Sequence, residues 1–78
     1  MINEELWKEL FSKRVREEMK RLGMTMDELS FATGLSLGTV YNCVSKITMP
    51  STKTVLCIAG ALGVKPDQLI YFEEVYYA

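Results

Sequence analysis

Three glycines, Gly23, Gly34 and Gly63, divide the sequence into segments whose apolar residues recur every three or four positions. This spacing is typical of α-helices. A glycine directly after such a segment is a common helix end, because glycine adopts the left-handed conformation there without strain. No stretch of useful length alternates apolar and polar residues as a half-buried strand would. The sequence therefore predicts an all-α fold with short connections.

Capping residues predict where the helices begin. Asn3, Thr25, Ser36 and Ser51 are good N-caps, and Glu28 follows Thr25 at the spacing of a capping box. The expected helices are 4 to 21 or 22, 26 to 33, 37 to about 45, 52 to 62, and a short fifth helix, begun by Pro66, from 67 to about 72. Their expected inward residues are Leu6, Trp7, Leu10, Phe11, Val15, Met19 and Leu22 in the first helix, Val40, Cys43 and Val44 in the third, and Val55, Leu56, Ile58, Ala59 and Leu62 in the fourth.

The size and composition of the chain predict one small globular domain. It has 78 residues, of which 49% are hydrophobic, an ordinary fraction for a folded protein. Its longest apolar-looking run, residues 55 to 64, is half the length that a membrane-spanning helix needs. The acidic, amphipathic amino terminus resembles neither a secretory signal nor a basic transit peptide. We therefore expect a cytoplasmic protein.

The residues needed for common enzymatic sites are missing. The chain has two cysteines, Cys43 and Cys57, and no histidine. Both cysteines have apolar neighbours at helical spacing, so we expect reduced core thiols in preference to a disulfide. Two thiols without histidine make neither a zinc site nor an activated nucleophile, and no glycine-rich phosphate loop follows a strand. The sequence predicts a protein that is not an enzyme and has no metal or cofactor.

Positive charge is concentrated in the middle of the chain. The net charge is −1, but residues 13 to 53 carry seven Lys or Arg and four Asp or Glu, an excess of +3. Residues 1 to 12 and 54 to 78 each carry −2. Because a local field matters more to a polyanion than the total charge, this distribution is compatible with nucleic-acid binding.

The middle of the chain resembles a known family. The stretch LGMTMDELSFATGLSLGTV, the Pro50-Ser51 pair and the stretch LCIAGALGVKPDQLI are similar, in this order, to the phage-repressor and Cro-type (XRE-like) helix-turn-helix DNA-binding family. The resemblance covers roughly residues 11 to 70. It implies a single five-helix, lambda-repressor-like domain over residues 1–78, with a core of about 11–70, an extended first helix and an aromatic tail at 71–78. It also implies that helix 37–45 enters the major groove, as part of a homodimer on a two-fold symmetric operator.

The sequence departs from this family at positions that usually contact DNA. Met26, Leu37 and Gly38 stand where members commonly have hydrogen-bonding side chains. Met19 and Val44 stand where many members have an Arg–Glu pair, and we expect these two apolar side chains to touch in the core. The recognition helix is therefore unusually poor in charge.

The residues expected on the DNA-facing side are Ser36, Leu37, Gly38, Thr39, Tyr41, Asn42, Ser45 and Lys46. Leu37 is expected to lie against a thymine methyl group, and Asn42 to pair with adenine or a phosphate. The hydroxyls of Thr39, Tyr41 and Ser45 suit phosphate oxygens. Phosphates would also be neutralised by Lys46, by Lys53, and by Lys13 or Arg14. The expected partner is double-stranded operator DNA.

Two further alternatives remain open from the sequence. The first is a protein–protein interaction module, or an antitoxin-like partner with weak DNA binding; an exposed apolar patch joining Met26, Phe31 and Leu37 would favour it.

The second concerns the ends of the chain. Their apolar residues form either a small core within one subunit or part of a dimer interface; the residues are Leu6, Trp7, Leu10, Phe72, Val75, Tyr76 and Tyr77. A regulatory protein partner is also possible, because 78 residues hold no separate sensor domain.

Overall fold

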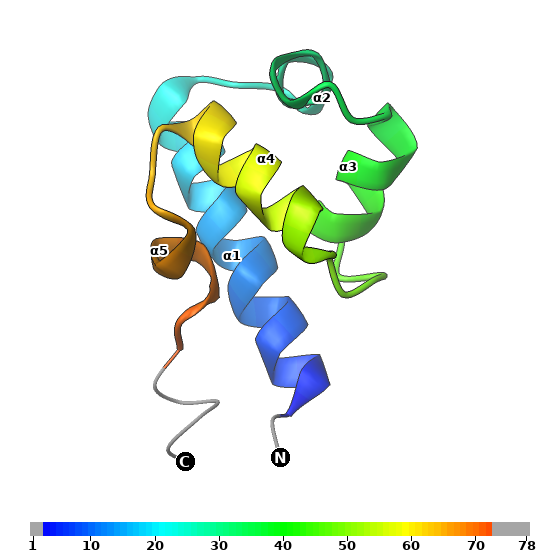
Figure 1. Ribbon diagram of the computed structural model, residues 1–78, viewed down its shortest axis with the longest axis vertical. Helices are drawn as coiled ribbons and strands as arrows, with labels where there is room; N and C mark the ends of the chain where they lie inside the picture. Colours follow the sequence, from blue (N-terminus) through cyan, green and yellow to red (C-terminus); the bar gives the residue numbers. More distant parts are fainter. Residues whose placement is uncertain (1–2, 73–78) are drawn as a thin grey trace.

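The computed structural model describes residues 3–72, and within these residues the chain forms five α-helices and no β-strand (Figure 1). The helices are α1 (Glu4–Leu22), α2 (Met26–Thr33), α3 (Leu37–Val44), α4 (Thr52–Leu62) and α5 (Pro66–Ile70). The predicted all-α fold with five helices and a long first helix is confirmed. The first, second and fourth helices have the predicted bounds. The third ends one residue earlier than expected, with Ser45 as its C-cap.

The predicted caps explain these boundaries. The Asn3 side chain accepts a hydrogen bond from the Leu6 N–H group at 3.1 Å. Thr25 and Glu28 form the expected capping box, in which each side chain accepts from the other residue's backbone N–H group. The hydrogen bond from the Thr25 backbone lowers the pKa of Glu28, because it stabilises the charged carboxylate. The helix starts are thus encoded locally.

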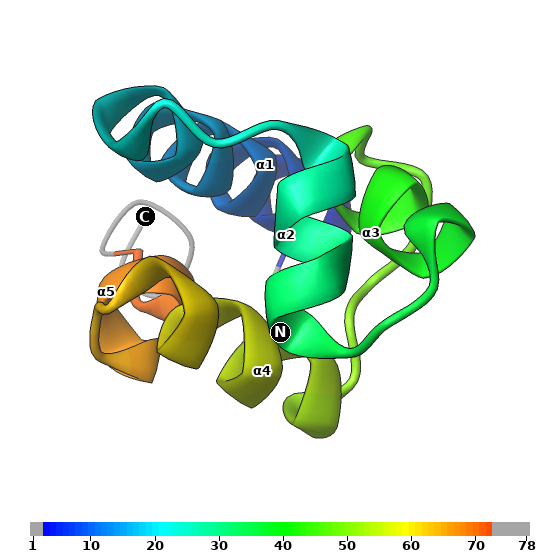
Figure 2. The same cartoon turned by 90° about the horizontal axis from the view of Figure 1, so that it is seen from above.

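The helices pack as a bundle around α1. The long α1 contacts α3, α4 and α5, whereas α2 contacts α3 and α4 at one end of the bundle (Figures 1 and 2). The buried apolar core draws on all five helices and on Phe72. The inward side of α3 is as predicted, with Val40, Cys43 and Val44 buried. This core fixes α3 by one side and leaves its other side outside the bundle.

An aromatic cluster joins the start of α1 to the chain after α5. Trp7 stacks on Phe11 with the ring centroids 5.1 Å apart, and it makes a T-shaped contact with Phe72 with the centroids 5.9 Å apart (Figure 1 shows the two segments side by side). The guanidinium of Arg14 lies 5.3 Å from the centroid of the Phe72 ring. Trp7 and Phe72 are both buried within the single chain, as expected for a core within one subunit. Val75, Tyr76 and Tyr77 lie outside the described residues.

Three sequence-based expectations about packing are wrong. The fifth helix ends at Ile70, and the extended backbone of Tyr71 turns Phe72 back into the core. Leu56 is 53% exposed and Leu22 is 44% exposed. Leu56 lies about 100° around α4 from Val55, off the buried stripe that continues through Ile58 and Leu62. Leu22 is the last residue of α1 and lies beyond Met19, the last buried residue of that helix.

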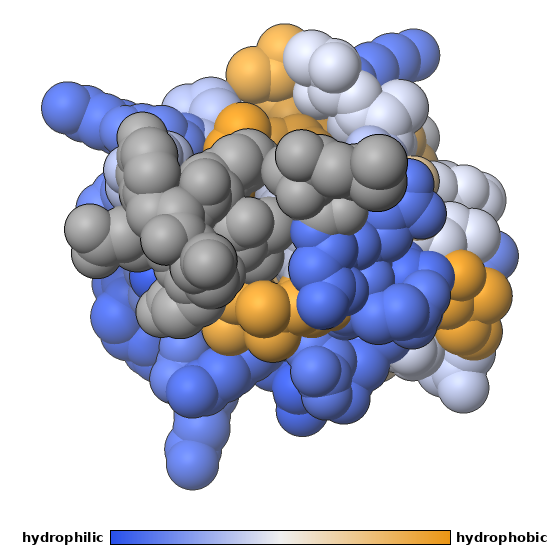
Figure 3. Space-filling model, turned by 90° about the horizontal axis from the view of Figure 1, so that it is seen from below, coloured by the Kyte–Doolittle hydropathy of each residue, from blue (hydrophilic) through white to orange (hydrophobic). Residues whose placement is uncertain are grey.

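Exposed apolar residues are distributed over several parts of the surface. Viewed from the end that carries the first turn of α1, the surface is mostly hydrophilic with separate hydrophobic patches (Figure 3). The exposed large apolar residues are Leu22, Phe31, Leu37, Tyr41, Ile47, Met49, Leu56 and Tyr71. Among the described residues, no helix is long and apolar enough to cross a membrane.

Both cysteines are free thiols, as expected from their neighbours. Cys43 is buried on the inner side of α3 and Cys57 is half-buried. Burial raises the pKa of the Cys43 thiol, because the apolar surroundings disfavour the thiolate. Residues 3–72 contain no group of three or more metal-ligating side chains.

Candidate nucleic-acid interface

The turn between α2 and α3 is fixed by glycine and by a side-chain hydrogen bond. Gly34 ends α2 with φ of 74°, a left-handed conformation that suits glycine. The hydroxyl of Ser30 donates to the carbonyl of Leu35 at 2.6 Å, across the turn. Ser36 then begins α3 as an extended N-cap. These local contacts set the angle between the two helices, whose arrangement Figure 2 shows from above.

The outer side of α3 presents most of the predicted site residues. Leu37 is 47% exposed and Tyr41 is 52% exposed, and Ser36, Gly38 and Lys46 are also exposed. Thr39, Asn42 and Ser45 are half-buried. All eight predicted residues therefore reach the surface along α3 or at its two ends.

Hydrogen bonds within the chain already occupy two of these side chains. The Ser36 hydroxyl accepts from the Thr39 N–H group at 3.1 Å and lies 2.9 Å from the Thr39 hydroxyl. This pair caps α3 and has less capacity left for a ligand. By contrast, the side-chain amide of Asn42 has no hydrogen-bond partner within residues 3–72, so its donor and acceptor groups are available.

A shallow apolar hollow lies between the first turns of α2 and α3. It is lined by Thr25, Met26, Asp27, Leu37, Gly38 and Tyr41. Met26 and Leu37 therefore belong to one apolar surface. Phe31, although 91% exposed, is not among the lining residues. Of the three residues Met26, Phe31 and Leu37 considered from the sequence, two line this hollow.

The local geometry matches a known fold family. The helix-turn-helix family model matches residues 15–69. The chain belongs to the helix-turn-helix family. It is also similar to the crystal structure of the restriction-modification controller protein C.AhdI from Aeromonas hydrophila, with a TM-score of 0.74 and 29% sequence identity over 83% of this chain and 96% of that chain. A search of curated proteins found no match.

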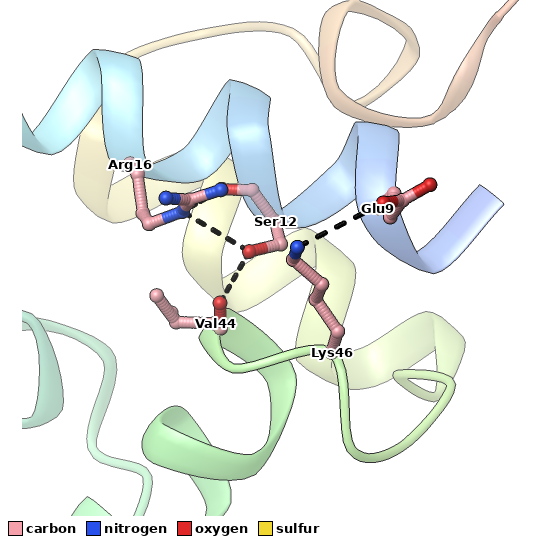
Figure 4. Close-up of polar contacts among 5 residues, drawn as sticks. All are labelled: Glu9, Ser12, Arg16, Val44 and Lys46. Carbon is pink, nitrogen blue, oxygen red and sulfur yellow. Dashed lines mark hydrogen bonds and ion pairs between the residues drawn. The ribbon is translucent and has the colours of Figure 1, made fainter. Parts of the chain in front are cut away.

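In this helix-turn-helix protein, the backbone of Lys46 adopts the left-handed conformation, which is unfavourable for lysine. Its φ is 66°, and it is the one non-glycine residue with positive φ among residues 3–72. Its ammonium group lies 3.9 Å from a carboxylate oxygen of Glu9 in α1 (Figure 4). Both side chains are substantially exposed, so this ion pair stabilises the fold little. A charged side chain is therefore held at the end of α3 at a conformational cost.

A buried serine connects α1 to the end of α3. The Ser12 side chain is fully buried, and its hydroxyl donates to the carbonyl of Val44 in the last turn of α3 (Figure 4). The same oxygen accepts from the Arg16 guanidinium at 3.2 Å. Ser12 is not among the core or site residues predicted from the sequence. The available signal was its position on the buried stripe of α1, three residues before Val15 and seven before Met19.

The cations expected near the DNA are only partly available there. Arg14 donates to the carbonyl of Gln68 and covers the ring of Phe72, so it lies on the α5 side of the molecule. The expectation that Arg14 neutralises a phosphate is not supported by this position. Arg21 pairs with Glu18 at 2.8 Å, as expected for a solvated helix surface. Lys13 and Lys53 are exposed and stay candidates.

Proposed function

We propose that this protein is a small repressor-like or Cro-like regulator that binds operator DNA as a homodimer and inserts α3 into the major groove. Membership of the helix-turn-helix family and the similarity to C.AhdI support a DNA-binding transcriptional regulator. The observation that carries the finer proposal is the outer side of α3, which is exposed and free of negative charge while the inner side is anchored in the core. An α-helix presented in this way fits the major groove of B-DNA.

The proposed contacts fall into two groups. Asn42 reads a base edge, since a side-chain amide forms two hydrogen bonds with adenine. Leu37 makes an apolar contact with a base. The hydroxyl of Tyr41 and the side chains of Ser45, Lys46 and Lys53 contact the phosphate backbone and fix the register of the helix. Ser36, Gly38 and Thr39 lie at the start of α3 and allow its close approach. No cofactor takes part in the proposed binding.

A second copy of the chain is the proposed partner of an apolar hollow away from α3. Leu56, 53% exposed, and Met49, 39% exposed, line it together with Val55 and Ile70. Trp7 also borders this hollow, although its ring is mostly buried by Phe11 and Phe72. Two-fold pairing there would present two recognition helices to half-sites about one helical turn apart on the DNA.

Selection from a pool of random duplex DNA tests the proposal. We expect recovery of a two-fold symmetric site whose affinity falls steeply between two salt concentrations, because phosphate contacts release counterions. Asn42→Ala is expected to relax the preference at one position of each half-site by about tenfold. Light scattering on the free and DNA-bound protein measures the dimer. Only weak binding without any enriched sequence would contradict the proposed function.

Substitutions at Lys46 and at its partner Glu9 are expected to change DNA affinity in opposite directions. Lys46→Gly is expected to raise the free energy of unfolding by about 0.5–1 kcal/mol, because glycine tolerates the left-handed backbone. The same change is expected to weaken binding to all duplexes about equally and to reduce the salt slope by about 1. Glu9→Gln removes a competing carboxylate, so we expect DNA binding to strengthen about two- to fivefold. Thermal unfolding and fluorescence anisotropy measure the two effects. Unchanged DNA affinity in both variants would remove Lys46 from the site.

One observation favours a second candidate function. Phe31 is 91% exposed on α2, and aromatic residues, phenylalanine among them, are enriched in protein–protein interfaces. An interaction module or antitoxin-like protein would use it to bind another protein. If the selection recovers no DNA sequence, Phe31 becomes the first residue to test in a search for a protein partner.

A further inference from the structure

The apolar hollow between α2 and α3 has properties that restrict what it can bind. Of its six lining residues, none is Lys or Arg, and Asp27 carries the only charge. Phosphate oxygens therefore find no cation in it and are repelled by Asp27. Its own occupant is expected to be small, apolar and uncharged.

The major groove offers one group of this kind. Base edges there present hydrogen-bond donors and acceptors, and the only apolar group is the methyl on C5 of a pyrimidine. Thymine carries this methyl in ordinary DNA, and 5-methylcytosine carries it in methylated DNA. The hollow is continuous with the exposed residues of α3, because Leu37, Gly38 and Tyr41 belong to both.

We infer that Met26, Leu37, Gly38 and Tyr41 form a receptor for the C5 methyl group of one pyrimidine in each half-site. This inference rests on the proposed DNA-binding function and specifies what the start of the recognition helix reads. It gives a physical role to the three positions where the chain lacks the polar residues common in its family. At these positions an apolar surface replaces hydrogen bonds as the means of base discrimination.

Gly38 is the residue that makes the methyl group accessible. A Cβ atom built at Gly38 would meet nothing within 4 Å in the free protein beyond its own helix and chain neighbours. Packing within the protein therefore does not require glycine at this exposed helical position, where glycine lowers helix stability. The space next to its backbone is instead available to a base edge that approaches between Met26 and Leu37.

Asp27 bears on which of the two methylated bases is preferred. Asp27 borders the hollow, and a carboxylate only accepts hydrogen bonds. The group next to the C5 methyl is an amino donor in 5-methylcytosine and a carbonyl acceptor in thymine. A carboxylate in reach of this group favours the amino donor, and the comparison of the two bases below separates the sources of the methyl group.

The test varies one pyrimidine position of the selected duplex at a time. At each position the base is thymine, uracil, 5-methylcytosine or cytosine, paired with its complementary base. The four combinations separate the methyl group from its neighbouring oxygen or nitrogen. At one position per half-site, we expect loss of the methyl group to weaken binding about three- to fivefold, in the thymine pair, the cytosine pair or both. The tighter of the two methylated duplexes identifies the base that the protein reads.

Two glycine variants connect this effect to the hollow. Gly38→Ala is expected to remove the difference between methylated and unmethylated duplexes and to weaken binding about fivefold or more, because the new methyl group occupies the hollow. Gly60→Ala is the matched control, since Gly60 is also exposed, helical and open to a Cβ atom but lies in α4. Both variants are expected to raise the thermal unfolding midpoint, and Gly60→Ala should keep the methyl effect.

The two proposals fail in different ways. A preferred duplex that binds equally with and without C5 methyl groups at every position would overturn this inference and leave the proposed function intact. The same holds if Gly38→Ala keeps the full methyl effect. Absence of any preferred duplex would overturn the proposed function and the inference together.

Discussion

Replacing Phe72 with alanine is expected to lower the free energy of unfolding by about 3–5 kcal/mol, as is usual when a fully buried aromatic ring is removed from a core. Phe72 is 1% exposed although it lies beyond the last helix. Its ring makes a T-shaped contact with Trp7 and a contact with the guanidinium of Arg14. The substitution therefore removes buried apolar area, an aromatic pair and a cation–π contact together. For a chain of 78 residues this is a large part of its total stability.

Phe31→Ala is the matched control for this prediction. It removes the same ring from a position that is 91% exposed, and we expect a change within about 0.5 kcal/mol. Urea unfolding followed by the fluorescence of Trp7, the only tryptophan in the chain, measures both variants. Trp7 itself contacts Phe72, so its emission in the folded state should also shift in Phe72→Ala. A loss below about 1 kcal/mol in Phe72→Ala would show that Phe72 contributes little to the core.

The aromatic cluster extends the core beyond the residues that define the family. The family model matches residues 15–69, whereas Trp7, Phe11 and Phe72 lie outside that range and are all buried. The long α1 and the segment after α5 therefore stabilise each other at the end of the bundle away from α2 (Figure 1). This arrangement adds buried area to a small domain.

The helices were predictable because their ends are encoded by local chemistry. Asn3, Thr25, Ser36 and Ser51 cap helices through hydrogen bonds to backbone groups three residues away. Such signals need no knowledge of the tertiary structure. The end of the fifth helix was wrong for the converse reason. Phe72 continues the apolar pattern, but it is buried by an extended turn at Tyr71 that depends on Trp7, far away in the sequence.

The candidate site was predictable in outline but not in its connections. The spacing of α3 identified its outer side, and all eight predicted residues reach the surface. Charge was harder to assign, because a basic residue in the sequence can be used within the fold. Arg14 covers Phe72, and Arg16 binds Ser12. Lys46 lies at the end of α3 as expected, yet its pairing with Glu9 depends on how α1 crosses this end.

The hydroxyl of Ser12 provides the second prediction with a large expected effect. Ser12→Ala is expected to lower the free energy of unfolding by about 1–3 kcal/mol, because it leaves the Val44 carbonyl without the hydrogen bond that it accepts from the buried hydroxyl. Carbonyls in the last turn of a helix have no partner within the helix. This one is held by α1 instead, so the same change should loosen the end of the recognition helix and weaken DNA binding. Chemical unfolding and fluorescence anisotropy with a selected duplex measure the two effects.

Arg16→Met separates the two hydrogen bonds of this hydroxyl. It removes the guanidinium that donates to Ser12 at 3.2 Å but keeps the hydroxyl that donates to Val44. Because the Arg16 side is exposed, water can replace the lost donor, and we expect a change below about 1 kcal/mol. If Ser12→Ala is instead as stable as the natural sequence, the buried hydroxyl is not needed to hold α3 against α1. If Ser12→Ala loses stability but binds the selected duplex normally, the hydroxyl supports the core without positioning the recognition helix.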